Sequence, residues 1–181
     1  IWQLPESYLC FSPPEFDLDV GPLPASSNGF VTFGCLNQLS KMTAAVVSVR
    51  AKILHAVPDS KLLLKNNGIN IEPNRSRILS MFSEAGIPPW RLILEGKSTR
   101  EEHLACYQRI DIALSPFPYN GGTTSAEALW MGVPVLTLRG DHFVSHVSES
   151  IVHNAGLSEW VAADEDEYIA KALAFSSALN A

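Results

Sequence analysis

Residues 118–127 contain the groups in this chain that are best suited to bind an anion, in the order PYNGGTTSAE. Gly121 and Gly122 are followed by the hydroxyls of Thr123 and Thr124, between a short apolar run and a helix-forming segment. A turn of this composition at the start of a helix exposes free backbone N–H groups at the positive end of the helix dipole, where a phosphate binds. The glycines let a diphosphate approach the backbone, and the threonines add hydroxyl donors.

An ordinary capped helix is the alternative interpretation of the same residues. Thr124 and Glu127 have the spacing of a capping box, which stabilises the start of a helix and needs no ligand. Short motifs of this kind also occur by chance. The local pattern alone therefore leaves both interpretations open.

The composition indicates a folded, acidic domain. Of the 181 residues, 46% are hydrophobic and 18% are charged, which is typical of a globular chain that buries about two-thirds of its unfolded surface. The net charge of −6 argues against nucleic acid as the main partner, because phosphate backbones are bound by basic faces. Local basic residues can still hold a small phosphate ligand.

The cysteines and the apolar runs favour a cytoplasmic protein with no membrane partner. Cys10, Cys35 and Cys106 are far apart, odd in number and without C-x-x-C spacing, so neither a disulfide framework nor a zinc ribbon is expected. No apolar run approaches the roughly 20 residues of a membrane span, and no signal peptide is visible. Because the chain begins at Ile1 and not at a methionine, we expect it to be a piece of a longer protein.

Apolar, β-rich runs alternate with helix-forming segments from residue 30 onward. We expect strands at about residues 30–35, 60–65, 91–95, 111–115, 134–138 and 159–162. Helices are expected between them at about 42–57, 73–85, 99–109, 123–131 and 142–154, with a last helix from Glu165. This alternation predicts an α/β fold with a doubly wound, Rossmann-like parallel sheet that helices cover on both faces.

The expected domain organisation has two parts. Residues 1–29 contain five prolines and predict a linker or arm that packs, extended, on the surface of the domain formed by residues 30–181. Ligands of doubly wound sheets bind beyond the carboxyl ends of the strands, which here means residues 34–41, 96–103 and 115–124. The first of these turns has neither G-x-G-x-x-G nor P-loop spacing, which weakens a dinucleotide or P-loop interpretation.

Three longer segments together resemble one family of enzymes. They are residues 31–41 (VTFGCLNQLSK), 117–124 (FPYNGGTT) and 129–135 (LWMGVPV). Their order and spacing are similar to those of the bacterial O-GlcNAc transferase and SPINDLY family, and the likeness extends from about residue 4 to residue 168. The resemblance implies the C-terminal, Rossmann-like half of a GT-B glycosyltransferase, which holds the nucleotide sugar. It also implies an N-terminal half and upstream tetratricopeptide repeats that have no counterpart in these residues.

The resemblance places two side chains of the first loop and two threonines at the diphosphate. Gln38 and Lys41 match contacts to the nucleotide sugar, and Thr123 and Thr124 match diphosphate-binding hydroxyls. Lys41 lies at the start of a predicted helix, where a lysine is unfavourable unless an anion lies between it and the helix dipole. A fixed ammonium there stabilises the charge that gathers on a departing diphosphate, so we expect Lys41 to be catalytic.

Other matches concern the backbone and the nucleoside. Gly122 stands where animal members have a histidine, so this contact, like that of Gly121, must come from the backbone. Arg100 and His103 match residues at the ribose and the base, and their spacing puts them on one side of a helix. Glu127 aligns with an acidic residue that binds the ribose hydroxyls.

Two positions depart from the family pattern, and two others have the chemistry of a metal site. Ser115 replaces an aspartate that is common in bacterial members, and His146 replaces a common arginine. His142 and His146 have a spacing that can bind zinc, but no third ligand is evident. The acidic run at 164–167 more simply favours the start of the last helix. With no D-x-D motif present, we expect a reaction without metal or other cofactor.

We therefore expect a domain that binds UDP-N-acetylglucosamine for transfer to Ser or Thr hydroxyls of a protein acceptor, inactive without its missing half. No residue is assigned as general base for the acceptor. One alternative is a SPINDLY-like protein O-fucosyltransferase that uses GDP-fucose. Another is a non-catalytic nucleotide-binding or scaffolding module, for which Ser115 and His146 are the hints.

Overall fold

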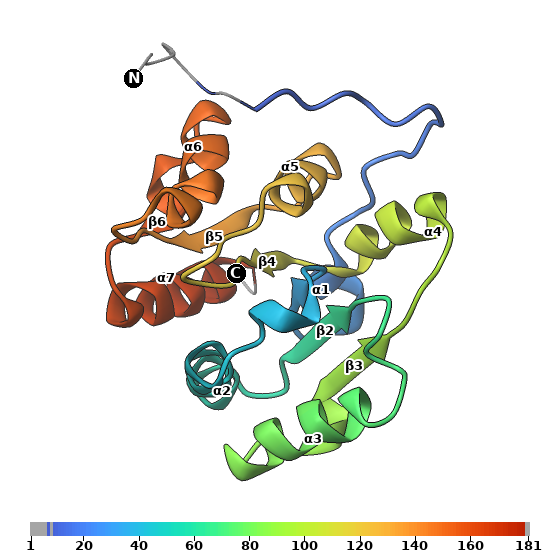
Figure 1. Ribbon diagram of the computed structural model, residues 1–181, viewed down its shortest axis with the longest axis vertical. Coiled ribbons are helices and arrows are strands. Elements are labelled where there is room, and N and C mark those ends of the chain that lie inside the picture. Colours follow the sequence, from blue (N-terminus) through green and yellow to red (C-terminus); the bar gives the residue numbers. More distant parts are fainter. Residues whose placement is uncertain (1–6, 8, 180–181) are drawn as a thin grey trace.

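The computed structural model describes residue 7 and residues 9–179, in which six strands form one parallel sheet (Figure 1). The strands are β1 (Thr32–Cys35), β2 (Lys61–Lys65), β3 (Leu92–Glu95), β4 (Ile112–Leu114), β5 (Val135–Leu138) and β6 (Val161–Ala162). Their order is β3-β2-β1-β4-β5-β6, and each neighbouring pair is parallel. The winding direction therefore reverses between β1 and β4, which confirms the predicted doubly wound sheet.

Helices cover both faces of the sheet (Figure 1). One face is covered by α2 (Ala44–Ala56), α3 (Asn74–Glu84) and α7 (Glu165–Ala178), the other by α4 (Arg100–Ala105), α5 (Thr123–Trp130) and α6 (Val147–Asn154). Each of these helices lies within a segment expected to be helical.

Two of the expected helices are shorter than predicted because part of each winds as a 3-10 helix. After α4 the chain continues as the 3-10 helix Cys106–Arg109, and the 3-10 helix Phe143–Ser145 precedes α6. In the second case Ser145 Oγ donates to the carbonyl of His142 at 2.6 Å and accepts from its N–H at 3.2 Å. This local ring of bonds competes with the α-helical pattern and delays the start of α6.

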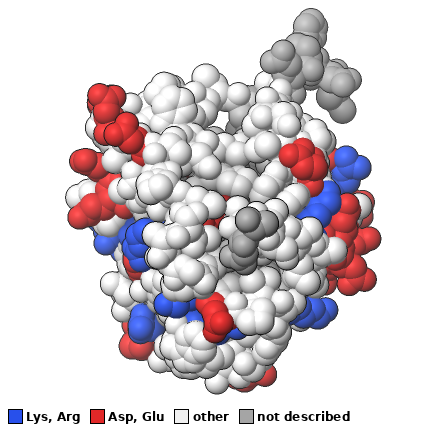
Figure 2. Space-filling view, turned by 180° about the vertical axis from the view of Figure 1, so that it is seen from behind, with Lys and Arg blue, Asp and Glu red and all other residues white. Residues whose placement is uncertain are grey.

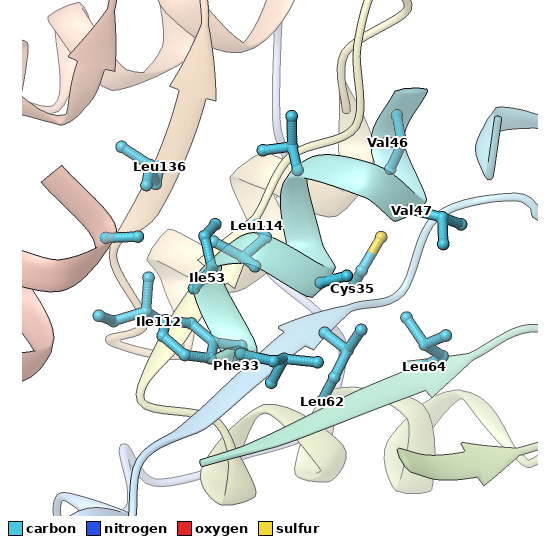
Figure 3. Close-up of a cluster of buried hydrophobic side chains, with 14 of the residues drawn as sticks. Phe33, Cys35, Val46, Val47, Ile53, Leu62, Leu64, Ile112, Leu114 and Leu136 are labelled. Carbon is cyan, nitrogen blue, oxygen red and sulfur yellow. The ribbon is translucent and has the colours of Figure 1, made fainter. Parts of the chain in front are cut away.

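The core under α2 holds the central strands in place (Figure 3). Phe33 of β1 is in register with Leu62 of β2 on one side and Ile112 of β4 on the other, and all three are 0% exposed. Val46 and Ile53 of α2 pack on them and are equally buried. Truncating a side chain such as Phe33 to alanine would cost about 3–5 kcal/mol. The ends of β1 and β4 are therefore rigid points from which the following loops leave.

The described part of the N-terminal arm packs along α4, α5 and α6, as Figure 1 shows in blue. It is extended up to α1 (Pro24–Asn28), a short helix that the sequence did not predict. The carboxylate of Asp111 anchors this region, because it accepts from the N–H of Ala25 at 2.8 Å and of Thr32 at 2.7 Å. Burial raises the pKa of Asp111, and the two backbone N–H groups oppose that rise. Arm residues 1–6 and 8, like residues 180 and 181, lie outside the described part of the chain.

The charged residues are distributed without a continuous basic field on the face that Figure 2 shows, where Lys and Arg are interspersed with Asp and Glu. Among the residues that the structure describes, no helix is both long and apolar enough to cross a membrane.

Candidate functional site

A cavity of about 490 Å³ opens beyond the carboxyl ends of β1, β2 and β4. Residues at the ends of these strands and in the loops that follow supply most of its lining, with additions from the arm, α4 and the start of α6. The cavity therefore lies where the strand order reverses, which is the usual position of ligands in this fold. The predicted site residues in its wall are Gln38, Lys41, His103, Gly122, Thr123 and Thr124.

Lys41 connects the loop after β1 to the loop after β4. Its Nζ donates to the carbonyl of Asn120 at 2.8 Å and lies 3.7 Å from the centre of the Tyr119 ring. Burial lowers the pKa of Lys41, and the nearby Cys35 opposes that effect. The predicted helix start at residue 42 was two residues too early: Lys41 ends the 3-10 helix Leu39–Lys41, and α2 begins at Ala44. What holds Lys41 near the cavity is thus the neighbouring loop and not the start of α2.

The hydroxyl of Thr124 is oriented by Asn37, which also lines the cavity. The Asn37 Nδ2 group donates to Thr124 Oγ1 at 2.8 Å, and Cys35 Sγ donates to Asn37 Oδ1 at 3.4 Å. The thiol thus fixes the amide with its NH₂ group toward the threonine. A hydroxyl that accepts from an amide keeps its own proton for another acceptor. Thr124 is therefore arranged as a donor.

The capping-box interpretation of Thr124 and Glu127 is wrong. The N-cap of α5 is Gly122, and no side chain caps this helix. The N–H of Ser125 donates to the Gly122 carbonyl at 2.9 Å, whereas the N–H groups of Thr123 and Thr124 have no partner among the described residues and remain available at the positive end of the helix dipole. Thr123 is exposed beside them at the cavity wall. This helix start can bind an anion through its backbone.

Gly121 does not line the cavity and is buried behind it. A Cβ atom placed on Gly121 would lie 2.6 Å from Thr124 Oγ1 and 2.7 Å from Ser125 Oγ. Contacts this short exclude a larger residue unless the Thr124 and Ser125 side chains rotate or the start of α5 moves. The need for glycine here therefore comes from the packing of the turn.

Glu127 is the centre of a buried charge cluster below the cavity. Its carboxylate pairs with Arg100 at 2.5 Å and with His103 Nε2 at 3.5 Å, and its side chain is only 3% exposed. Burial by itself raises the pKa of Glu127, but hydrogen bonds and charge from His103 and Arg100 outweigh it, so the pKa lies below the ordinary value. The shared side of α4 expected for Arg100 and His103 is confirmed, since both contact this one carboxylate.

The two departures from the family pattern both have partners in the structure. Ser115 Oγ bonds to Ser148 Oγ at 2.9 Å, and His146 Nδ1 lies 2.6 Å from a carboxylate oxygen of Glu149. The other oxygen of Glu149 pairs with Arg139 through two nitrogens. Burial raises the pKa of Glu149, but hydrogen bonds and charge from Arg139 and His146 lower it by more, so the net shift of the pKa is downward.

The sequence analysis missed several residues of the cavity wall. Lys65 is the last residue of β2, and Asn66 begins the loop after it. Tyr119 lies beside Lys41, and Leu9 comes from the arm. A signal existed for Lys65 and Asn66, because they follow an apolar strand at the edge where ligands bind. Leu9 gave no such signal, since its position depends on how the arm packs. Arg100 lines a neighbouring cavity of about 410 Å³ between the arm and α5.

Among residue 7 and residues 9–179, no group of three or more His, Cys, Asp or Glu side chains could hold a metal ion. His142 lies before the 3-10 helix Phe143–Ser145 and His146 after it, so the two histidines do not share an α-helical face.

Together the sheet order and the cavity at its switch point define a Rossmann-like domain of the kind found in GT-B glycosyltransferases. The chain belongs to glycosyl transferase family 41, whose family model matches residues 23–180. The resemblance seen in the sequence is thereby confirmed.

Several named proteins are similar to the chain over most of its length. The rice protein named probable UDP-N-acetylglucosamine–peptide N-acetylglucosaminyltransferase SPINDLY is 41% identical over 180 residues, which is 99% of this chain and 19% of the rice protein. The Caenorhabditis elegans UDP-N-acetylglucosamine–peptide N-acetylglucosaminyltransferase is 30% identical over 94% of this chain and 14% of its own length. The chain thus spans about a fifth or less of these relatives.

Solved structures agree with this assignment. A mutant of the Thermobaculum terrenum O-GlcNAc transferase superposes with a TM-score of 0.84 at 39% identity, covering 93% of this chain and 32% of that one. Sucrose-phosphate synthase from Thermosynechococcus elongatus has a TM-score of 0.53 at 13% identity, and the match covers 90% of this chain and 47% of the synthase. The second similarity concerns the fold alone.

Proposed function

We propose that this chain is the donor-binding half of a transferase that moves N-acetylglucosamine from UDP-N-acetylglucosamine to Ser or Thr hydroxyls of proteins. One observation carries the proposal: the cavity gathers an ammonium group, two threonine hydroxyls and the uncapped start of α5 between β1 and β4. These groups suit a diphosphate. The names of the rice and nematode relatives support the choice of sugar and of a peptide acceptor.

The transfer breaks the bond between the anomeric carbon of the sugar and a diphosphate oxygen, which keeps the electron pair. The acceptor oxygen forms the new bond to that carbon and loses its proton to a base. In this proposal Lys41, Thr123, Thr124 and the N–H groups of α5 stabilise the charge on the departing diphosphate. Because an ammonium and a helix start supply this positive field, the proposal needs no divalent cation.

The nucleoside is assigned to the cluster around Glu127. His103 lies in the cavity wall, and Arg100 lies in the wall of the neighbouring cavity. Both contact the Glu127 carboxylate and leave it covered. A ribose can therefore reach this carboxylate only after Arg100 or His103 moves, whereas His103 itself is available to pack against a base.

The remainder of the active site belongs, in this proposal, to a first Rossmann half, preceded by tetratricopeptide repeats, in a cytoplasmic protein. The acceptor and its general base would contact that half. The 181-residue chain is then expected to bind nucleotide but to transfer no sugar.

The proposal is tested with a purified protein that contains this chain and the rest of its catalytic region. It is incubated with a Ser/Thr-containing peptide and either labelled UDP-N-acetylglucosamine or labelled GDP-fucose. We expect label from the first donor on the peptide, and none when the 181-residue chain is used alone. Transfer from GDP-fucose only would establish the fucosyltransferase alternative. If neither donor binds or reacts, the non-catalytic module remains. Turnover by the chain alone would refute the two-half account.

A further inference from the structure

Both polar groups of the Gly121 residue are held by buried serine hydroxyls. The N–H of Gly121 donates to Ser115 Oγ at 3.0 Å, and its carbonyl accepts from Ser148 Oγ at 2.7 Å. Ser115 Oγ and Ser148 Oγ are 2.9 Å apart. Ser125 Oγ adds contacts of 2.7 Å to Ser148 Oγ and 3.2 Å to the Gly121 carbonyl. The three serines follow β4 or belong to α5 and α6, so three elements meet at one residue.

The directions of these hydrogen bonds follow from counting protons. A serine hydroxyl has one proton, and a carbonyl oxygen can only accept. Ser148 Oγ lies nearer to the Gly121 carbonyl than Ser125 Oγ does, at 2.7 Å against 3.2 Å. With Ser148 as the donor to that carbonyl, Ser115 and Ser125 both donate to Ser148. Ser115 in turn accepts from the Gly121 N–H. The result is a closed ring, from the N–H of Gly121 through Ser115 and Ser148 back to the carbonyl of Gly121.

The ring is buried, so the loss of any one of its hydrogen bonds leaves a polar group without a partner. Ser115, Ser125 and Ser148 are 4%, 3% and 0% exposed. Little water reaches these positions, so a buried group that loses its partner stays unpaired, which destabilises the fold. Hydrogen bonds arranged head to tail also polarise one another. The orientation of the Gly121 residue is therefore strongly favoured over alternatives.

Gly121 directly precedes Gly122, the N-cap of α5. The orientation of the Gly121 residue thus sets where the first N–H groups of α5 point. We propose that Ser148, acting through Ser115 and Gly121, is a positioning residue that aims the start of α5 at the diphosphate of the donor. The inference rests on the proposed function for its ligand, but the ring itself does not.

Ser115 stands where bacterial members commonly have an aspartate, and that substitution suggested a module without chemistry. In this chain Ser115 accepts from Gly121 and donates to Ser148, so it is a required link of the ring. The substitution is accordingly compatible with a working donor site.

Hydrogen exchange of the Gly121 amide, measured by NMR, tests the ring without any ligand. Ser148→Ala removes a hydroxyl that does not touch this N–H, yet the ring predicts roughly tenfold faster exchange, because Ser115 loses its acceptor. Ser176→Ala is the matched control: Ser176 is 2% exposed, lies in α7 and, among the residues that the structure describes, its hydroxyl bonds only to the Ala172 carbonyl of its own helix. Unchanged exchange in Ser148→Ala would overturn the ring.

Calorimetry with UDP and UMP tests the positioning role. We expect Ser148→Ala and Ser115→Ala to weaken UDP binding about tenfold and to reduce the preference for UDP over UMP, while Ser176→Ala stays within about twofold. A merely structural role would lower the melting temperature without changing that preference. If the wild-type chain binds UDP and Ser148→Ala binds it equally well, the positioning role is wrong. If the wild-type chain binds no nucleotide, the proposed function fails, and the exchange experiment still decides the ring.

Discussion

The loop after β1 and the loop after β4 face the same cavity but are built in opposite ways. The first presents side chains: Gln38 is exposed, and Lys41 reaches across the gap from a short 3-10 helix. Apart from the exposed Tyr119 ring, the second presents backbone, which buried side chains hold from behind. Asn120 is 0% exposed and its amide donates to the carbonyls of Pro116 and Leu138, while Gly121 is fixed by the serine ring.

The difference separates two ways of stabilising a negative charge. A lysine supplies a full charge, and its position depends on what it touches. Fixed backbone dipoles supply less charge but need no reorganisation when the charge develops. The two loops are also joined, by Lys41 to the Asn120 carbonyl and by Asn37 to Thr124. The rigid loop therefore positions the charge that the other loop brings.

The largest expected effect comes from removing that charge. In a protein with the whole catalytic region, Lys41→Ala should lower kcat by about 100-fold or more, because its ammonium acts mainly as the diphosphate departs. Folding should be little affected, since the side chain is only half-buried and, in the described part of the chain, makes one hydrogen bond, to the Asn120 carbonyl. Steady-state kinetics measures kcat, and a melting curve measures the effect on folding. Lys41→Arg, which keeps the charge, should retain more activity than Lys41→Ala. Near-normal kcat in well-folded Lys41→Ala would remove this lysine from the mechanism.

A smaller effect is expected where the loops are joined. Asn37→Asp replaces the donor to Thr124 by a carboxylate, which accepts the Thr124 proton and adds negative charge. UDP binding should weaken about tenfold or more. Calorimetry checks this on the 181-residue chain.

The control for Asn37→Asp is Asn67→Asp. Asn67 lines the same cavity and is exposed, so Asn67→Asp introduces the same charge at a residue for which the described part of the chain shows no hydrogen bond to Thr124. Asn67→Asp should weaken UDP binding less than Asn37→Asp does. Equal losses in the two variants would mean that charge alone acts and that the orientation of the Thr124 hydroxyl is irrelevant.

His103→Ala should affect binding more than chemistry. A contact to the base is made equally in the ground state and the transition state, so donor KM should rise while kcat stays nearly constant. The rise should be about two- to tenfold, the contribution of one aromatic contact. Steady-state kinetics with varied donor concentration measures it. A fall in kcat with unchanged KM would show that His103 acts on the reacting atoms and not on the nucleoside.

The smallest effect concerns stability and its dependence on pH. Because the pKa of Glu127 is lowered in the folded state, the charged carboxylate stabilises the fold above its unfolded pKa of about 4.3, and this contribution is lost as the pH falls through the folded value. Glu127→Gln should cost about 1 kcal/mol at pH 7, since Arg100 is half-exposed and screened. Denaturant unfolding at pH 7 and near pH 3 should show the gap between variant and wild type narrowing in acid. A gap that widens in acid would contradict the charge cluster.

The fold was largely predictable from the sequence because each strand is a short apolar run and each helix a separate periodic segment. The positions of β1 to β6 agree with the expected runs to within about two residues. The start of α2 was misplaced because Lys41 and Met42 continue a helix-like pattern, whereas Thr43 caps the helix by accepting from Val46 N. Such a cap is a matter of side-chain direction, which hydrophobic spacing does not report.

The site was predictable only where a residue belongs to a contiguous motif. Lys41 and Thr124 were found because they stand in such segments, and the structure brings them to one cavity. The serine ring was not predicted, since Ser115 and Ser148 are 33 residues apart and meet only when β4 and α6 pack together. Likewise, the ion pairs of Glu127 depend on how α4 lies against α5. Their effects on ligand binding stay predictions.

We infer that the two loops together form one diphosphate site, and the affinities of UDP and UMP test this most directly. Calorimetry on the 181-residue chain should give UDP at least about tenfold tighter binding than UMP, and Lys41→Ala should lose most of this preference. Equal affinities for UDP and UMP in the wild-type chain would contradict the claim, as would a preference that Lys41→Ala leaves intact.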